Sequence, residues 1–148
     1  MDWGERYEQG IARMDETHRE FVEHYNTLAA AEPGNFLACF DAFIAHTEAH
    51  FDQENRWMDV LDFPPCHRGE HDRVLDVMRE VRRRVEQGDA FLGRRLLEEL
   101  HPWFDHHVDT MDAALAFYLK ETGFDPDTCM GKTAHAPGDA AHLAGGDR

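Results

Sequence analysis

The chain has 148 residues, which predicts one domain. Its 30 acidic side chains outnumber 15 basic ones, and the formal net charge is -15. Such a surface repels phosphate groups, which argues against nucleic acid and anionic membranes as partners. No apolar run approaches the roughly 18 residues of a membrane span, and the acidic start, Met1–Glu5, has no apolar signal core. We therefore expect neither membrane insertion nor secretion.

Prolines and glycines divide the chain into long segments without strand-like alternation. The sequence predicts four helices, at residues 15–31, 36–61, 66–87 and 90–121. The predicted N-caps are Asp15, Asn35 and Asp89, and the predicted C-terminal stops are Gly88 and Gly123.

The two ends of the chain differ from this helical part. Residues 1–13 contain Trp3, Tyr7 and Ile11 and are expected to pack as an N-terminal arm. Residues 122–148 are rich in Gly, Ala, Pro and Asp, which indicates a flexible C-terminal tail.

Apolar residues recur within each helix in alternating steps of three and four. In the first helix, for example, the row runs through Met14, Phe21, Tyr25 and Leu28. This period is typical of the seam of a bundle packed like a coiled coil, and short loops make neighbouring helices antiparallel. The fold class is therefore all-α, with an antiparallel up-down-up-down four-helix bundle over residues 14–121.

Polar residues occupy six seam positions where Leu or Ile would be expected. These are His18, His50, Glu54, His67, His71 and His107. Each buried polar group without a partner costs about 1–3 kcal/mol, so six of them need a common partner. His50 with Glu54, and His67 with His71, are i,i+4 pairs whose side chains share a helix face and can converge on one ion. The pattern predicts a metal site in the core.

The other histidines and the three cysteines have simpler interpretations. His24, His46, His101 and His106 lie off the seam and are expected at the surface or behind the ligands, and His135 and His142 fall in the tail. Cys39, Cys66 and Cys129 are scattered, which favours free thiols and a reducing, cytoplasmic location.

Five imidazoles and one carboxylate exceed the coordination sphere of one ion. Two ions need a bridging carboxylate, and Glu54 can supply one. A second bridge is expected from the fourth helix, where Asp105, Asp109 and Asp112 are candidates. Spacing alone does not choose among them, since Asp112 lies five residues after His107, about 140° round an ideal α-helix.

Five motifs together resemble those of the bacterial hemerythrins. They are Trp3 with Tyr7, Gly10 and Ile11; D-x-x-H at Asp15–His18; H-F-x-x-E at His50–Glu54; H-x-x-x-H at His67–His71; and W-x-x-x-H-V-x-x-x-D at Trp103–Asp112. The resemblance covers residues 3–120 and implies Asp112 as the seventh ligand.

The resemblance also implies a non-haem di-iron centre. One iron would take His67, His71 and His107, and the other His18 and His50, leaving one position open. Glu54 and Asp112 would bridge both irons together with an oxo or hydroxo group. The apolar walls of the O2 pocket would be Phe21, Phe51, Trp103, Phe104 and Val108.

The implied function is reversible O2 binding, for carriage, storage or delivery to a client oxidase. NO and small anions such as azide would be further ligands, and we expect a monomer that is not an enzyme. The alternatives are sensing of O2, NO or redox state at the same site, a di-iron oxidase or peroxidase, and a zinc-binding bundle. Against the enzyme, the one Glu-x-x-His pair, Glu98 with His101, lies off the seam, and no proton relay is evident.

Three departures from the family pattern carry expectations of their own. Phe21 and Phe104 stand where Leu is frequent, which predicts a tighter pocket. Asn55 replaces a second Glu after the bridging one, an expected change behind the ligands. Pro102 lies inside the fourth helix, and a kink there is predicted to help aim His107 and Asp112 together.

Overall fold

The computed structural model describes residues 1–131. Its elements are the short 3-10 helices η1 (Glu5–Tyr7) and η2 (Pro33–Asn35), the helices α1 (Ala12–Ala29), α2 (Phe36–Leu61), α3 (Cys66–Glu86) and α4 (Ala90–His107), the π-helical turn η3 (Val108–Asp112), the helix α5 (Ala113–Thr122), and the strands β1 (Phe124–Asp125) and β2 (Met130–Gly131). The predicted tail histidines, His135 and His142, lie outside the described residues.

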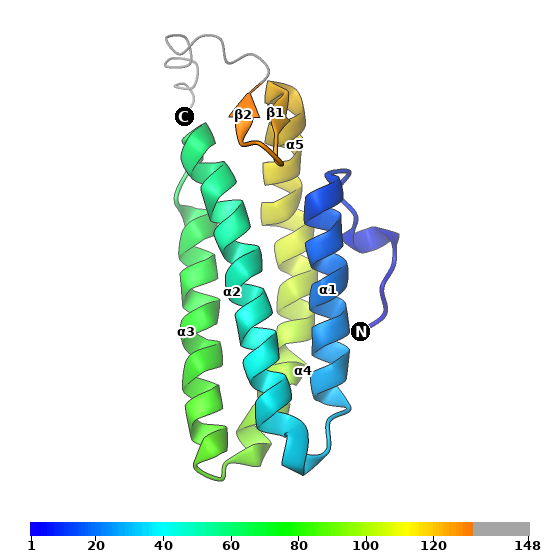
Figure 1. The fold of residues 1–148 in the computed structure, drawn as a ribbon, viewed down its shortest axis with the longest axis vertical. Coiled ribbons are helices and arrows are strands. Elements are labelled where there is room, and N and C mark those ends of the chain that lie inside the picture. The colour runs from blue at the N-terminus through cyan, green and yellow to red at the C-terminus, as the bar shows by residue number, and fades with distance from the viewer. Residues whose placement is uncertain (132–148) are drawn as a thin grey trace.

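Four long helical columns form an antiparallel bundle (Figure 1). The fourth column consists of α4, η3 and α5 in succession, and each column packs against the next around the bundle. The predicted all-α, up-down-up-down four-helix fold is confirmed. Within the described part of the chain, no helix is both long and apolar enough to cross a membrane.

The helix ends follow local backbone chemistry, with one correction. α1 begins at Ala12, so Asp15 lies inside its first turn and is not the N-cap. Its carboxylate instead accepts hydrogen bonds from the backbone N–H groups of Gln9 and Gly10, at 2.6 and 3.2 Å. Asp89 caps α4 as predicted, accepting from the backbone N–H of Leu92.

The helix α4 is continuous through Pro102 and passes directly into η3. A π-helical turn pairs residues five apart instead of four. The regular register of the fourth column is therefore interrupted at residues 108–112, six residues after the proline.

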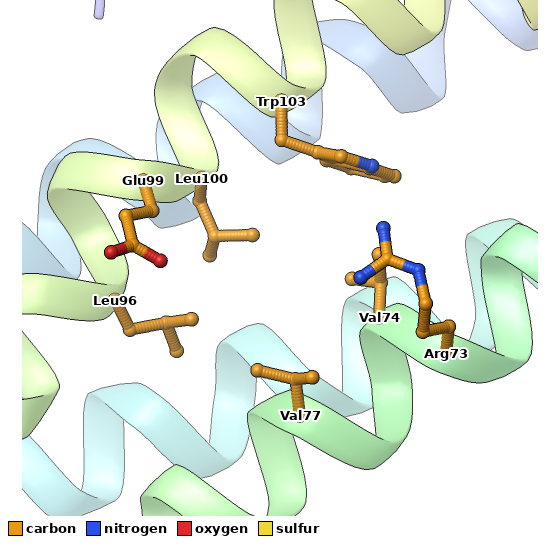
Figure 2. Close-up of a pocket in the computed structure, with 7 residues that line it drawn as sticks. All are labelled: Arg73, Val74, Val77, Leu96, Glu99, Leu100 and Trp103. Carbon is orange, nitrogen blue, oxygen red and sulfur yellow. The ribbon is translucent and has the colours of Figure 1, made fainter.

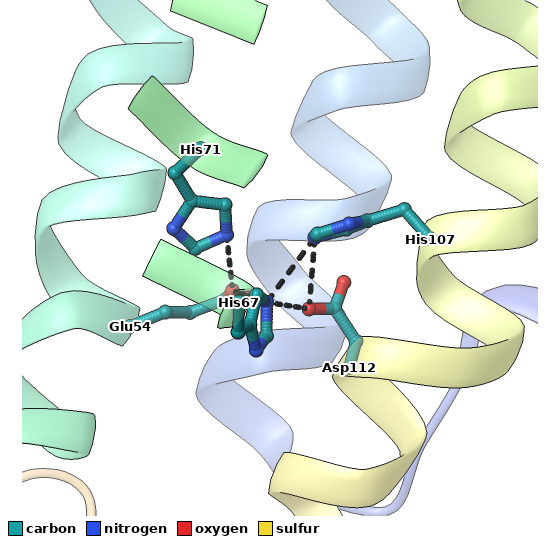
Figure 3. A group of neighbouring side chains, drawn as sticks. All are labelled: Glu54, His67, His71, His107 and Asp112. Carbon is teal, nitrogen blue, oxygen red and sulfur yellow. Dashed lines mark hydrogen bonds and ion pairs between the residues drawn. The ribbon is translucent and has the colours of Figure 1, made fainter. Parts of the chain in front are cut away.

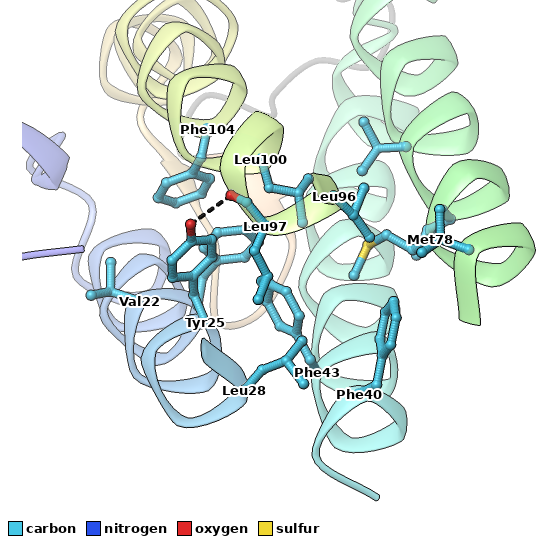
Figure 4. Close-up of a cluster of buried hydrophobic side chains, with 14 of the residues drawn as sticks. Val22, Tyr25, Leu28, Phe40, Phe43, Met78, Leu96, Leu97, Leu100 and Phe104 are labelled. Atoms are coloured by element: carbon cyan, nitrogen blue, oxygen red, sulfur yellow. Dashed lines mark hydrogen bonds between the residues drawn. The ribbon is translucent and has the colours of Figure 1, made fainter. Parts of the chain in front are cut away.

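Two apolar clusters fill the bundle above and below a belt of polar side chains. The larger cluster includes Phe21, Tyr25, Phe43 and Met78, and the Tyr25 hydroxyl donates a hydrogen bond to the Leu97 carbonyl (Figure 4). The smaller cluster consists of Ile11, Met14, Trp57, Met58, Leu115, Ala116, Leu119 and Phe124. Along α1, α2 and the fourth column, the predicted metal ligands fall between residues of the two clusters.

The N-terminal arm packs against the bundle, with the Tyr7 ring only 2% exposed. At the other end, residues 124–131 differ from the predicted flexible tail. They form a short antiparallel hairpin, the Phe124 ring is buried in the smaller cluster, and the Trp57 indole N–H donates to the Pro126 carbonyl at 3.1 Å. The aromatic contact of Phe124 explains why the start of this glycine- and aspartate-rich segment is folded.

Candidate metal centre

Each wall of the bundle contributes a polar side chain to one buried cluster. α1 supplies one histidine, α2 a histidine and a glutamate, α3 two histidines, α4 a histidine and η3 an aspartate. None of these seven side chains is more than 2% exposed; they are His18, His50, Glu54, His67, His71, His107 and Asp112. Burial of so many polar groups in one belt destabilises the fold unless they hydrogen-bond to one another or bind an ion.

The seven residues divide into two groups that share both carboxylates. The first group contains His67, His71 and His107 with Glu54 and Asp112 (Figure 3), and the second contains His18 and His50 with the same two carboxylates. Within each group the candidate ligand atoms lie within 4.8 Å of one another. Two adjacent ion positions are therefore built into the core, one with five candidate ligands and one with four.

Each carboxylate turns one oxygen toward each group. For Glu54, Oε1 lies 3.3 Å from His71 Nε2, and Oε2 lies 3.1 Å from His50 Nε2. For Asp112, Oδ1 lies 3.0 Å from His67 Nε2, and Oδ2 lies 2.9 Å from His18 Nε2. A carboxylate placed between two ligand groups in this way is suited to bridge two ions.

The π-helical turn explains why Asp112 belongs to the cluster. In an α-helix Asp112 would point well away from His107, but η3 has the five-residue repeat that brings two such residues to one face. Asp112 Oδ1 accordingly lies 3.3 Å from His107 Nε2. The other candidates, Asp105 and Asp109, face the N-terminal arm, where they pair with Arg6.

Two ligand imidazoles are oriented by hydrogen bonds through Nδ1. His18 donates to the backbone carbonyl of Tyr7 at 2.8 Å, and His71 donates to the Asn55 side-chain oxygen at 2.9 Å. The expected position of Asn55 behind the ligands is therefore observed. The contribution of the Tyr7 carbonyl carries no signature in the sequence, because any residue type offers that group.

The comparisons with known proteins agree with this geometry. Residues 9–117 match the family model described as the hemerythrin HHE cation binding domain. The chain belongs to the hemerythrin family. It is 49% identical over 127 residues to a bacteriohemerythrin of Ralstonia nicotianae, covering 84% of this chain and 93% of that protein. It is 27% identical over 124 residues to a bacteriohemerythrin of Stenotrophomonas maltophilia, covering 80% of each. No solved structure matches it significantly.

A hemerythrin domain implies non-haem iron, and the donor set fits that metal. Imidazole and carboxylate ligands suit iron, and ligand atoms about 2.1 Å from an ion, at right angles to each other, lie about 3 Å apart. The short distances between nitrogens and oxygens in the cluster match this spacing. Three buried ligand atoms, Glu54 Oε1, His71 Nε2 and Asp112 Oδ1, have no hydrogen-bond partner among the described residues, as expected of atoms that bind an ion.

Without metal, protons occupy part of the site. Burial lowers the pKa of His18, but the hydrogen bond and charge of Asp112 outweigh burial and raise that pKa to about 9. The same balance, with Asp112 and Glu54 as partners, raises the pKa of His67 to about 9. Burial raises the pKa of both carboxyls, yet the surrounding imidazoles hold them well below their usual range. Metal must therefore displace protons from these two histidines.

This competition predicts a pH dependence of metal stabilisation. The raised pKa values of His18 and His67 stabilise the metal-free protein fully below pH 6.5, and this contribution is lost as the pH rises through about 9. Over the same range metal binding strengthens, because fewer protons must be released. We expect the difference in Tm between metal-loaded and metal-free protein to widen from pH 6.5 to pH 9. A constant or narrowing difference would contradict the assignment of these histidines.

The predicted O2-pocket residues lie on two different sides of the site. Phe21 and Phe104 stack at 4.0 Å, and the Phe104 ring meets His18 edge-on at 5.5 Å. Val108 is fully buried, and Phe51 stacks on His71 at 3.9 Å while also lying 5.3 Å from His50.

Trp103, another predicted wall residue, contacts the cluster from the side of α3 and α4. Its ring stacks on His107 at 4.6 Å, on the three-histidine side, and its indole N–H donates to Glu70. The same ring lines a surface groove between α3 and α4, together with Val74, Leu96 and Leu100 (Figure 2). Trp103 and Phe104 are consecutive residues of α4, and neighbouring residues on a helix face different sides.

The remaining described histidines stand outside both ligand groups. His24 and His46 stack on each other at 4.9 Å, and His46 Nε2 lies 3.3 Å from the Thr17 carbonyl. Burial and the neighbouring His50 and His24 lower the pKa of His46 to about 4. His101 lies 3.5 Å from Asp105, and neither it nor His106 approaches the cluster.

Proposed function

We propose that the protein binds O2 reversibly at a di-iron centre and serves as an oxygen carrier, store or delivery protein. One observation carries the proposal: two buried ligand groups share Glu54 and Asp112, and one group has a ligand fewer than the other. When bound, a pair of irons supplies the two electrons that O2 binding requires. The iron held by His18 and His50 would have the open coordination position, and O2 would bind there.

The residues around the cluster support O2 binding without cleavage of the O–O bond. His67, His71 and His107 would hold one iron with its protein ligands complete, and the shared carboxylates offset the metal charge. The stacked rings of Phe21 and Phe104 beside His18 form an apolar wall, which favours a neutral gas over water. These two phenyl rings offer no proton for O–O cleavage.

The test is a spectroscopic cycle on the iron-loaded protein. The protein is reduced without air, exposed to O2, and then flushed with inert gas while the visible spectrum is recorded. A charge-transfer band that appears with O2 and disappears on its removal supports the proposal. Irreversible oxidation, turnover of a substrate, or a single bound zinc in the purified protein would contradict it.

The stacked wall predicts the speed of ligand exchange. Replacing Phe21 with Leu removes one ring of the stack next to His18, so we expect O2 dissociation and autoxidation to be several-fold faster in stopped-flow and spectral measurements. Phe40→Leu is the matched control, since Phe40 is also fully buried but its one described ring contact is with Phe36. Equal rate changes in both variants would show that Phe21 acts only through packing.

A further inference from the structure

Among residues 1–131, Asn55 is the one side chain that accepts a hydrogen bond from Nδ1 of a candidate iron ligand. It follows Glu54 on α2, is 9% exposed, and its side-chain oxygen lies 2.9 Å from His71 Nδ1. His71 Nε2 points the other way, toward Glu54 Oε1 at 3.3 Å. When Nε2 serves the metal, Nδ1 must carry the proton, so the Asn55 amide must present its oxygen as the acceptor.

α2 holds the His71 ring by its face as well as by its edge. Phe51, one helical turn before Asn55, stacks on His71 with ring centroids 3.9 Å apart and planes 6° from parallel. The aromatic contact fixes the plane of the imidazole, and the amide contact fixes its rotation within that plane. On the side away from the ligand cluster, His71 is thus oriented by two neutral side chains.

The neutrality of the acceptor has a chemical consequence. A carboxylate on the outer N–H of a ligating imidazole makes the ring more basic and a stronger donor, which favours the ferric state. A neutral amide orients the ring without that effect. The other acceptor observed on a ligand Nδ1 is the backbone carbonyl of Tyr7, also neutral, and His50, His67 and His107 have no Nδ1 partner among the described residues.

We propose that Asn55 is a positioning residue that keeps the three-histidine iron in its ferrous form by giving His71 a neutral acceptor. The inference rests on the proposed di-iron function and deepens it, because the ferrous form is the one that binds O2. Reduction of this iron adds one electron to Fe3+ and gives Fe2+, with an electrode as the electron source through a soluble mediator. The amide shifts this balance toward Fe2+ relative to a carboxylate in its place.

The experiment is a spectroelectrochemical titration of the iron-loaded protein in the absence of O2. Asn55→Asp keeps the size of the side chain and places a carboxylate on the His71 N–H. We expect the ratio of ferrous to ferric iron at a fixed potential to fall at least about tenfold, equivalent to about 59 mV for one electron. Asp52→Asn is the charge control. It removes one negative charge at an exposed position one turn earlier on α2, so the size of its shift shows what a distant unit charge does to the potential.

Asn55→Leu separates orientation from charge. It retains the bulk but offers no acceptor, so we expect iron affinity to fall about 10–100-fold without a lowered potential. The inference is overturned if Asn55→Asp raises the reduction potential, or if it lowers the potential by no more than the size of the opposite shift in Asp52→Asn. A parent protein that holds two irons but binds no O2 would overturn the proposed function alone, because the titration measures the potential without O2.

Discussion

Replacing Glu54 with Gln is expected to remove both irons from the protein while the bundle still folds. The two Glu54 oxygens face different ligand groups, with Oε1 near His71 and Oε2 near His50, so one change weakens both positions. The amide has the same shape but lacks the charge that offsets two cations, and its nitrogen cannot bind them. Iron analysis and native mass spectrometry would report the loss, with circular dichroism as the check on folding.

Two comparison variants make this result specific. His50 belongs to only one group, so His50→Ala is expected to retain one iron per chain, in the three-histidine position. His24 lies outside both groups and stacks on His46, so His24→Ala should retain both irons. If Glu54→Gln and His50→Ala lose the same single iron, Glu54 is not shared between the two positions.

The sequence predicted the bundle and the burial of six candidate ligands because both follow from helical periodicity. Alternating steps of three and four place His18, His50 and His67 on the inner faces, and burial confirms those faces. The bounds predicted for the second helix match α2, and the fourth column extends one residue beyond the predicted end. Periodicity is a strong signal here because the polar residues interrupt an otherwise apolar seam.

Periodicity could not select Asp112, and the reason is geometric. The rule of 3.6 residues per turn holds for an α-helix, and the segment that carries Asp112 is a π-helical turn. The resemblance to known motifs supplied this ligand where spacing could not. The π turn accounts for the convergence of His107 and Asp112, and a kink at Pro102 as a cause stays a prediction.

The sequence pattern also did not predict which distant segments contact each other. The place of Trp103 beside the open iron position stays a prediction, and its stacking on His107 and its share in the groove between α3 and α4 had no signal in the sequence. Asp15 was expected to cap α1, but it binds the backbone of the preceding turn. Both outcomes depend on which neighbour a side chain meets in space, which a single sequence does not specify.

The N-terminal arm is expected to contribute strongly to stability through Tyr7. Its ring is 2% exposed, stacks on Trp3 at 5.8 Å and lies 5.4 Å from Phe104, and its hydroxyl donates to Asp105. Removal of a buried aromatic side chain costs about 3–5 kcal/mol, so Tyr7→Ala should lower the free energy of unfolding by that amount. Denaturant unfolding of the metal-free protein would measure it.

Tyr7 also links that stability to the metal centre, because its carbonyl accepts the hydrogen bond from His18 Nδ1. Tyr7→Phe keeps the ring and the carbonyl and loses only the bond to Asp105, so we expect a cost of about 1 kcal/mol and unchanged iron content. Tyr7→Ala loosens the arm, and iron should be lost first from the position that contains His18. Phe117→Ala at a 64% exposed site is the control, with an expected change within about 0.5 kcal/mol. If Tyr7→Ala unfolds like the Phe117 control, the arm does not hold His18 in place, and the orientation of that ligand must come from Asp112 alone.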